Sequence, residues 1–120
     1  MELIDRREND VRILQLSGRF DTYTADSVRR WIESNTDAPP AQIVVNLQDV
    51  SFVDSTGLAT LVQGMKRSRQ HGGDLLLCHL QQPVRLIFEL TRLDRAFEVL
   101  PTEEDAVAAF NTPQTQQATA

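Results

Sequence analysis

Short, fully apolar runs alternate along this sequence with longer segments of helical periodicity, and this alternation limits the possible folds more than any other feature. Residues 43–45 form an unbroken β-branched run, and residues 75–78 form a second apolar run. Such runs are typical of strands covered on both faces. Because helix-like segments separate them, the pattern predicts right-handed crossovers on a mostly parallel sheet.

Four segments between and after these runs carry apolar residues at the spacing of an amphipathic helix. The first extends from Thr22 to about Ser34, and the second has its apolar positions at 58, 61, 62 and 65. A third starts at Pro83, a residue that suits the first turn of a helix. The fourth starts near Thr102, which with residue 105 has the spacing of a capping box.

The first part of the chain predicts a hairpin. Leu3–Arg6 and Val11–Leu16 are apolar-rich runs, and the residues between them have the Asn/Asp chemistry of a tight turn. Gly18 should end the second strand, and residues 97–100 should form a short last strand. We therefore expect a single small α/β domain over residues 1–110. Its mostly parallel sheet should have about five strands, an antiparallel N-terminal edge strand and about four helices, followed by a polar, disordered tail over 111–120.

Composition excludes several classes of protein. The single cysteine, Cys78, cannot form an internal disulfide, and no Cys/His cluster has metal-ligand spacing, so we expect no metal or cofactor. The net charge of −5, with scattered basic residues, argues against nucleic acid as a partner. Residues 1–5 lack the regions of a signal peptide, and no apolar run approaches the roughly 20 residues that span a bilayer. We therefore expect a cytoplasmic protein without membrane insertion.

Partners and ligands of open parallel sheets gather beyond the carboxyl ends of the strands. Three loops are expected there: Ser17–Thr24, Asp49–Gly57 and His79–Pro83. The middle loop passes from apolar residues to an acid, two hydroxyls and a glycine, and then leads directly into a helix. Ser55 is therefore expected at a helix start, where backbone N–H groups lack partners.

The residues alone leave two interpretations of this helix start open. Asp54, Ser55 or Thr56 could simply be the N-cap, with Gly57 easing close packing. Alternatively, Ser55 could accept a phosphoryl group, because a helix N-terminus stabilises a dianion by about 1 kcal/mol or more. In that case the added charge would leave the fold intact and would repel a docked protein.

Three segments resemble the STAS domain family, and specifically its branch of bacterial anti-sigma factor antagonists. They are Val-Val-Asn-Leu at 44–47, Val-Ser-Phe-Val-Asp-Ser-Thr-Gly-Leu at 50–58 and Gly-Gly-Asp-Leu at 72–75. The resemblance runs from the hairpin to the last helix, and the Asp-Ser-Thr-Gly-Leu segment is its most specific part. Phe20 departs from the smaller aliphatic residue of the family, and the Gln-rich tail is outside the pattern.

The resemblance implies a regulatory function without catalysis. Ser55 would be phosphorylated by an anti-sigma factor that is also an ATP-dependent serine kinase, and a phosphoserine phosphatase would reverse the reaction. The unphosphorylated protein would bind the anti-sigma factor and thereby free a sigma factor for transcription. The resemblance implies a docking surface that comprises Asp21, Thr22, Asp54, Ser55, Thr56 and Gly57.

Enzymatic functions fit the residues poorly. A serine hydrolase would need a base near Ser55, but His71 lies at the far end of the predicted helix and Val53 replaces the glycine of a nucleophile elbow. A phospho-aspartate receiver would need an acidic pair and a lysine at the site, whereas Lys66 lies on a helix and the early acids lie in the hairpin. Two non-enzymatic alternatives stay open: a STAS subunit regulating a transport or signalling complex, and a small-ligand sensor.

Overall fold

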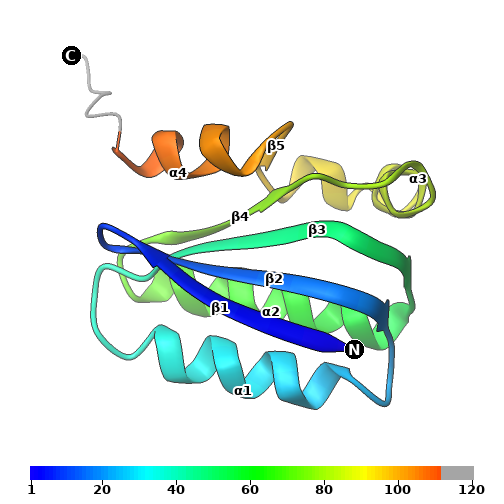
Figure 1. The fold of residues 1–120 in the computed structure, drawn as a ribbon, viewed down its shortest axis with the longest axis horizontal. Helices are drawn as coiled ribbons and strands as arrows, with labels where there is room; N and C mark the ends of the chain where they lie inside the picture. The colour runs from blue at the N-terminus through cyan, green and yellow to red at the C-terminus, as the bar shows by residue number, and fades with distance from the viewer. Residues whose placement is uncertain (112–120) are drawn as a thin grey trace.

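The computed structural model describes residues 1–111, which form one five-stranded sheet with helices on both faces. The elements in chain order are β1 (Glu2–Glu8), β2 (Val11–Phe20), α1 (Ala25–Asn35), β3 (Gln42–Val53), α2 (Ser55–Gln70), β4 (Asp74–Cys78), α3 (Gln82–Leu90), the 3₁₀ turn η1 (Leu93–Arg95), β5 (Val99–Leu100) and α4 (Glu103–Asn111). Figure 1 shows α1 and α2 on one side of the sheet and α4 on the other. The predicted tail lies outside the described residues, except for Asn111, which ends α4.

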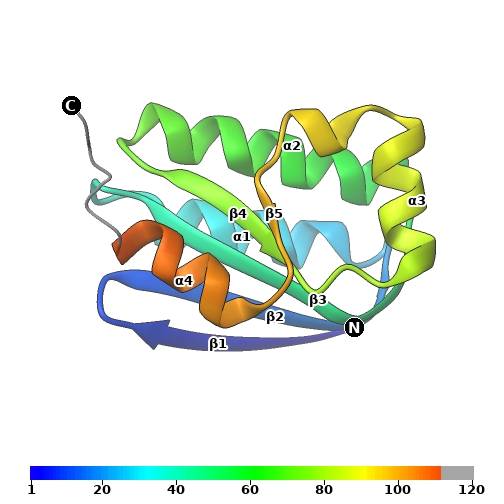
Figure 2. The ribbon, with the colours of Figure 1, turned by 90° about the horizontal axis from the view of Figure 1, so that it is seen from above.

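The strands follow one another across the sheet in chain order, β1-β2-β3-β4-β5. β1 pairs antiparallel with β2, and every later pair is parallel. The predicted α/β class, the antiparallel edge strand and the four helices are therefore confirmed. Because β2, β3 and β4 are parallel, their carboxyl ends meet at one end of the sheet, where Figures 1 and 2 place the starts of α1, α2 and α3.

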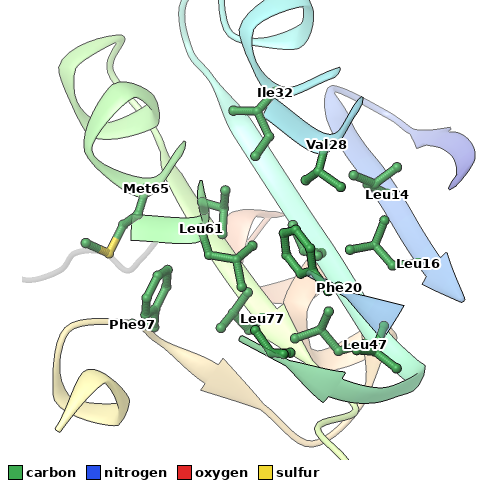
Figure 3. Packing of buried hydrophobic residues seen from close by; sticks show 14 of the residues in the cluster. Leu14, Leu16, Phe20, Val28, Ile32, Leu47, Leu61, Met65, Leu77 and Phe97 are labelled. Atoms are coloured by element: carbon green, nitrogen blue, oxygen red, sulfur yellow. The ribbon is translucent and has the colours of Figure 1, made fainter. Parts of the chain in front are cut away.

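Two hydrophobic clusters hold the helices against the sheet. The larger cluster lies between the sheet and α1, α2 and α3, and Figure 3 shows Phe20, Leu61 and Leu77 meeting within it. The smaller cluster lies on the other face, where Ala106 and Val107 of α4 cover the sheet. β3 contributes to both clusters because its side chains alternate between the two faces, which explains its unbroken run of apolar residues.

Several predicted boundaries are wrong at the end of the sheet that carries the starts of α1, α2 and α3. β2 continues through Gly18 to Phe20, and β3 continues to Val53, where both strands were expected to end earlier. Gly18 has a φ of +107°, and the β2–β3 register shifts on either side of it, so the strand passes through an irregularity instead of ending. The last strand is also shorter than predicted, because Phe97 turns into the core before β5 begins.

The first helix starts later than the apolar spacing predicts. α1 begins at Ala25, and residues 21–24 form a hydrogen-bonded turn after β2. The Asp21 N–H donates to Thr24 Oγ1 (2.9 Å), and the Thr24 N–H donates to the Asp21 carbonyl (3.1 Å). These two bonds close the turn locally, and they leave Thr22 outside the helix.

The predicted position of Pro83 is confirmed, and one of the two bonds of the predicted capping box at Thr102 is present. Pro83 lies in the first turn of α3, where its missing N–H breaks no helical hydrogen bond. At the start of α4, the Asp105 N–H donates to Thr102 Oγ1 (3.1 Å). The hydroxyl of Thr102 therefore satisfies one of the unpaired amides of that helix.

Candidate functional site

Ser55 is the first residue of α2, directly after the N-cap residue Asp54. The Gly57 N–H donates to Asp54 Oδ1 (2.9 Å), so the aspartate carboxylate is the helix cap. Ser55 is exposed, and its hydroxyl has no hydrogen-bond partner within residues 1–111. The structure thus assigns the capping role to Asp54, and the Ser55 hydroxyl takes no part in the cap.

The second oxygen of Asp54 ties the start of α2 to the turn that follows β2. Both the N–H and the hydroxyl of Thr22 contact Asp54 Oδ2, at 3.1 and 3.3 Å. Thr22 Oγ1 is also 3.1 Å from Thr56 Oγ1. Since each hydroxyl has one proton, Thr22 donates to the carboxylate and Thr56 donates to Thr22. Hydrogen bonds therefore join four of the predicted docking residues, Thr22, Asp54, Thr56 and Gly57. The other two, Asp21 and Ser55, are their neighbours along the chain.

Main-chain contacts hold the start of α2 against the end of β2. The Asp54 N–H donates to the carbonyl of Phe20 (3.1 Å), which joins the ends of β2 and β3. Gly57 is buried, and a Cβ placed on it would lie 2.7 Å from the same Phe20 carbonyl oxygen. The absence of a side chain at Gly57 therefore lets α2 approach β2 closely. A contact between Gly57 and a partner stays a prediction, and the packing supplies a separate reason for a glycine here.

Hydrogen bonds lower the pKa of Asp54. The Gly57 N–H is the main cause, and the amide and hydroxyl of Thr22 add to it. All of these donors favour the ionised carboxylate. Ser55 therefore lies next to a fixed negative charge at neutral pH, so a second anionic group at this position concentrates charge on one small surface.

The pH dependence of stability should reveal this cap. We expect Asp54→Asn to lower the free energy of unfolding at pH 7, because an amide can accept from Gly57 but its NH₂ group cannot accept from Thr22. The contribution of a carboxyl with a lowered folded pKa is fully present above its ordinary value of 3.8 and is lost as the pH falls through the folded pKa. Urea unfolding at pH 7 and pH 2.5 should therefore show a difference between the proteins that is smaller at the lower pH. An equal difference at both values would contradict the role of the carboxylate.

The turn residues that hold this surface were only partly identified from the sequence. Asp21 was predicted as a docking residue, and the structure shows that its side chain accepts from the Tyr23 N–H (3.0 Å). Thr24 was not predicted, although its hydroxyl accepts from Asp21 and contacts the Arg19 carbonyl (2.9 Å). The Asp-x-x-Thr spacing of a reciprocal side-chain turn was the available signal.

Within residues 1–111, none of the hydrogen bonds made by the two histidines and the cysteine involves Ser55. His71 caps the far end of α2, and His79 Nε2 accepts from the Glu103 N–H (3.1 Å) at the start of α4. Cys78 is buried beneath the sheet face that carries α4, and burial raises the pKa of its thiol to about 12. Within the described part of the chain, no three His, Cys, Asp or Glu side chains are grouped to hold a metal ion.

The sheet order, the crossovers and the capped helix start define a STAS-type α/β domain. The sequence profile described as "STAS domain" matches residues 3–106, and the chain belongs to this family. It is 30% identical to the anti-sigma F factor antagonist of Paenibacillus polymyxa, over 83% of this chain and 84% of that protein. It is 31% identical to the anti-sigma-B factor antagonist of Listeria monocytogenes, over 83% of this chain and 88% of that protein.

The fold comparison agrees with the sequence comparison. The crystal structure of an anti-sigma factor antagonist from Mycobacterium paratuberculosis superposes with a TM-score of 0.82 and 27% identity, and the match covers 92% of this chain and 94% of that one. The STAS resemblance predicted from the Asp-Ser-Thr-Gly-Leu segment is thus confirmed. Between residues 1 and 111, no helix combines the length and the hydropathy needed to cross a membrane.

Proposed function

We propose that this protein is an anti-sigma factor antagonist that binds a serine-kinase anti-sigma factor and is released when Ser55 is phosphorylated. The observation that carries the proposal is the exposed Ser55 hydroxyl, which has no partner in the described residues while Asp54 performs the capping. An acceptor hydroxyl must reach the γ-phosphate of ATP in a kinase, and a hydroxyl engaged as a helix cap would first have to give up its bond. Ser55 is the residue that the partner kinase phosphorylates, and it has no catalytic role.

The helix start tolerates the product of this reaction. The first amides of α2 point out of the helix, and the helix dipole favours negative charge at this end. A phosphoserine carries about −1.5 to −2 charges at neutral pH and three strong acceptor oxygens. The fold therefore keeps its stability, and the cost falls on a partner surface that would have to bury the dianion beside the ionised Asp54.

The relatives support the choice of partner. Two proteins about 30% identical to this chain over most of its length are named anti-sigma factor antagonists. By this likeness, the partner is an anti-sigma factor with ATP-dependent serine kinase activity, and a phosphoserine phosphatase restores binding. The cycle runs in the cytoplasm, where the sigma factor and ATP are present.

Phosphotransfer with purified proteins tests the proposal. The protein is incubated with ATP and each serine-kinase anti-sigma factor encoded in the same genome, and peptide mass spectrometry locates the phosphate. We expect one phosphate on Ser55 that survives acid and hydroxylamine, and Thr56→Val should still carry it on Ser55, which separates the two neighbouring hydroxyls as acceptors. A hydroxylamine-labile phosphate on Asp54 would instead indicate receiver chemistry. Absence of transfer from every kinase would favour a STAS subunit of another assembly or a ligand sensor.

A further inference from the structure

The turn between β2 and α1 presents one aromatic side chain to solvent. Tyr23, the only tyrosine of the chain, is 94% exposed, whereas Leu90, the next most exposed large apolar residue among residues 1–111, is 74% exposed. A single exposed apolar residue on a surface is ordinary. Tyr23 differs from such residues because its turn is held by hydrogen bonds and lies next to the start of α2.

Side-chain hydrogen bonds hold the backbone of this turn on both sides of the ring. The Tyr23 N–H donates to Asp21 Oδ1 (3.0 Å), and the Thr24 hydroxyl lies 2.9 Å from both the Asp21 amide and the Arg19 carbonyl. The Thr22 N–H donates to Asp54 Oδ2 (3.1 Å). The turn is thus fixed by its own side chains and by the N-cap of α2, although none of these bonds involves the tyrosine side chain. A fixed backbone lowers the entropy lost when such a ring enters a binding pocket.

We infer that Tyr23 is the aromatic anchor with which the unphosphorylated protein engages the serine-kinase anti-sigma factor, an inference that rests on the proposed function. Tyrosines are among the residues that dominate binding at protein interfaces, because they bury a large apolar ring and keep a polar hydroxyl at its tip. The ring is one residue from Thr22, which holds Asp54 and contacts Thr56. A partner that covers the Ser55 surface therefore meets Tyr23 as well.

The other exposed apolar side chains lack this connection. Leu86 and Leu90 lie on α3, Ile4 lies on the edge strand β1, and Met1 precedes that strand. None of the hydrogen bonds of the Asp54 network involves these four residues. The β2–α1 turn and the β3–α2 turn are adjacent at one end of the sheet in Figures 1 and 2, which agrees with the hydrogen bonds between them.

The surroundings of the ring define the surface of the partner that receives it. The Tyr23 N–H donates to the turn acid Asp21, and the preceding residue, Thr22, donates to the ionised Asp54. The complementary surface is an apolar pocket for the ring with basic or amide donors at its rim. The ring supplies affinity, and the charge on Ser55 decides whether the two surfaces can close. Tyr23 and Ser55 therefore have separate roles at one interface.

Binding measurements with matched variants test the inference. Calorimetry with the purified kinase in its ADP-bound form would compare wild type with Tyr23→Ala, Tyr23→Phe, Ile4→Ala and Ser55→Asp. We expect Tyr23→Ala to weaken binding roughly 10- to 100-fold and Tyr23→Phe to keep most of the affinity, because the ring remains. Ile4→Ala should bind like wild type, since it removes an exposed apolar side chain from the edge strand. Urea unfolding should show that Tyr23→Ala folds normally.

The outcomes show whether the anchor at Tyr23 fails alone or fails together with the proposed function. If Ser55→Asp loses binding and Tyr23→Ala does not, the proposed function stands and the anchor is wrong. If Tyr23→Ala and Ile4→Ala lose affinity equally, the effect is general and the anchor is also wrong. If wild type binds none of the serine-kinase anti-sigma factors of the genome, the proposed function fails and the inference falls with it. Loss with Tyr23→Ala and recovery with Tyr23→Phe supports the anchor.

Discussion

Ser55→Asp should weaken binding to the serine-kinase anti-sigma factor by about 100-fold or more, while Ser55→Ala should bind like wild type. A 100-fold loss corresponds to about 2.7 kcal/mol, which is the scale of leaving one buried charge without a partner. The introduced carboxylate follows the ionised Asp54 directly, so a docked surface would have to desolvate two neighbouring negative charges. Alanine removes the hydroxyl and adds no charge. Isothermal titration calorimetry with the ADP-bound kinase measures both affinities.

The fold of both variants should be unchanged, and this is the control for the charge effect. Ser55 is exposed and its hydroxyl bonds to nothing in residues 1–111, so its removal should change the free energy of unfolding by less than about 0.5 kcal/mol. A carboxylate in the first turn also suits the helix dipole. Enzymatically phosphorylated wild type should lose binding at least as strongly as Ser55→Asp, because its charge is larger. Equal affinity of all these forms would end the charge-switch account.

The sheet was predictable because its central strands are covered on both faces. Residues 43–45 of β3 and 75–78 of β4 are buried throughout, and only strands with helices on both sides require such runs. Once the strands and helices alternate, the handedness of the crossovers leaves few topologies. The hairpin at residues 1–16 was equally clear, because antiparallel strands can follow one another through a short turn.

The ends of β2 and β3 were not predictable by the same reasoning. A glycine at position 18 normally indicates a turn, yet tertiary pairing with β3 carries β2 through it to Phe20. Likewise, Gln48 and Asp49 are polar and exposed inside β3, and the strand continues because Val50 and Val53 are buried beyond them. In both strands, long-range contacts override a local signal.

The position of the candidate site at a helix start was predictable, and the residue that caps the helix was not. The sequence placed Ser55 at a helix start, but three neighbouring polar residues could each have been the cap. That Asp54 accepts from both Gly57 and Thr22 is visible only in the folded chain, because Thr22 lies in a different loop. A contact between two loops far apart in sequence leaves no periodic signal. The same is true of the exposed ring of Tyr23, which depends on how the turn is held.

The second large effect concerns the close packing of Gly57 in α2 against the end of β2. Gly57→Ala should lower the free energy of unfolding by about 1 to 3 kcal/mol, the usual range for overpacking. The added Cβ would lie 2.7 Å from the Phe20 carbonyl oxygen and 3.0 Å from Val53 Cγ1, and backbone at that distance cannot rotate away. Because the same carbonyl accepts from the Asp54 N–H, the clash acts on the segment that positions Ser55. The variant should therefore also be phosphorylated more slowly than wild type.

Gly64→Ala is the matched control for this prediction, since it makes the same substitution in the same helix at another buried glycine. A Cβ on Gly64 would meet Ile32 Cδ1 at 2.8 Å and Leu75 Cδ1 at 3.1 Å, both of them ends of flexible side chains. Alanine also gains up to about 1 kcal/mol over glycine inside a helix, so Gly64→Ala should stay within about 1 kcal/mol of wild type. Urea unfolding and phosphotransfer rates of the two variants give the comparison. If both glycines tolerate alanine equally, the close contact between α2 and the Phe20 carbonyl does not constrain the switch.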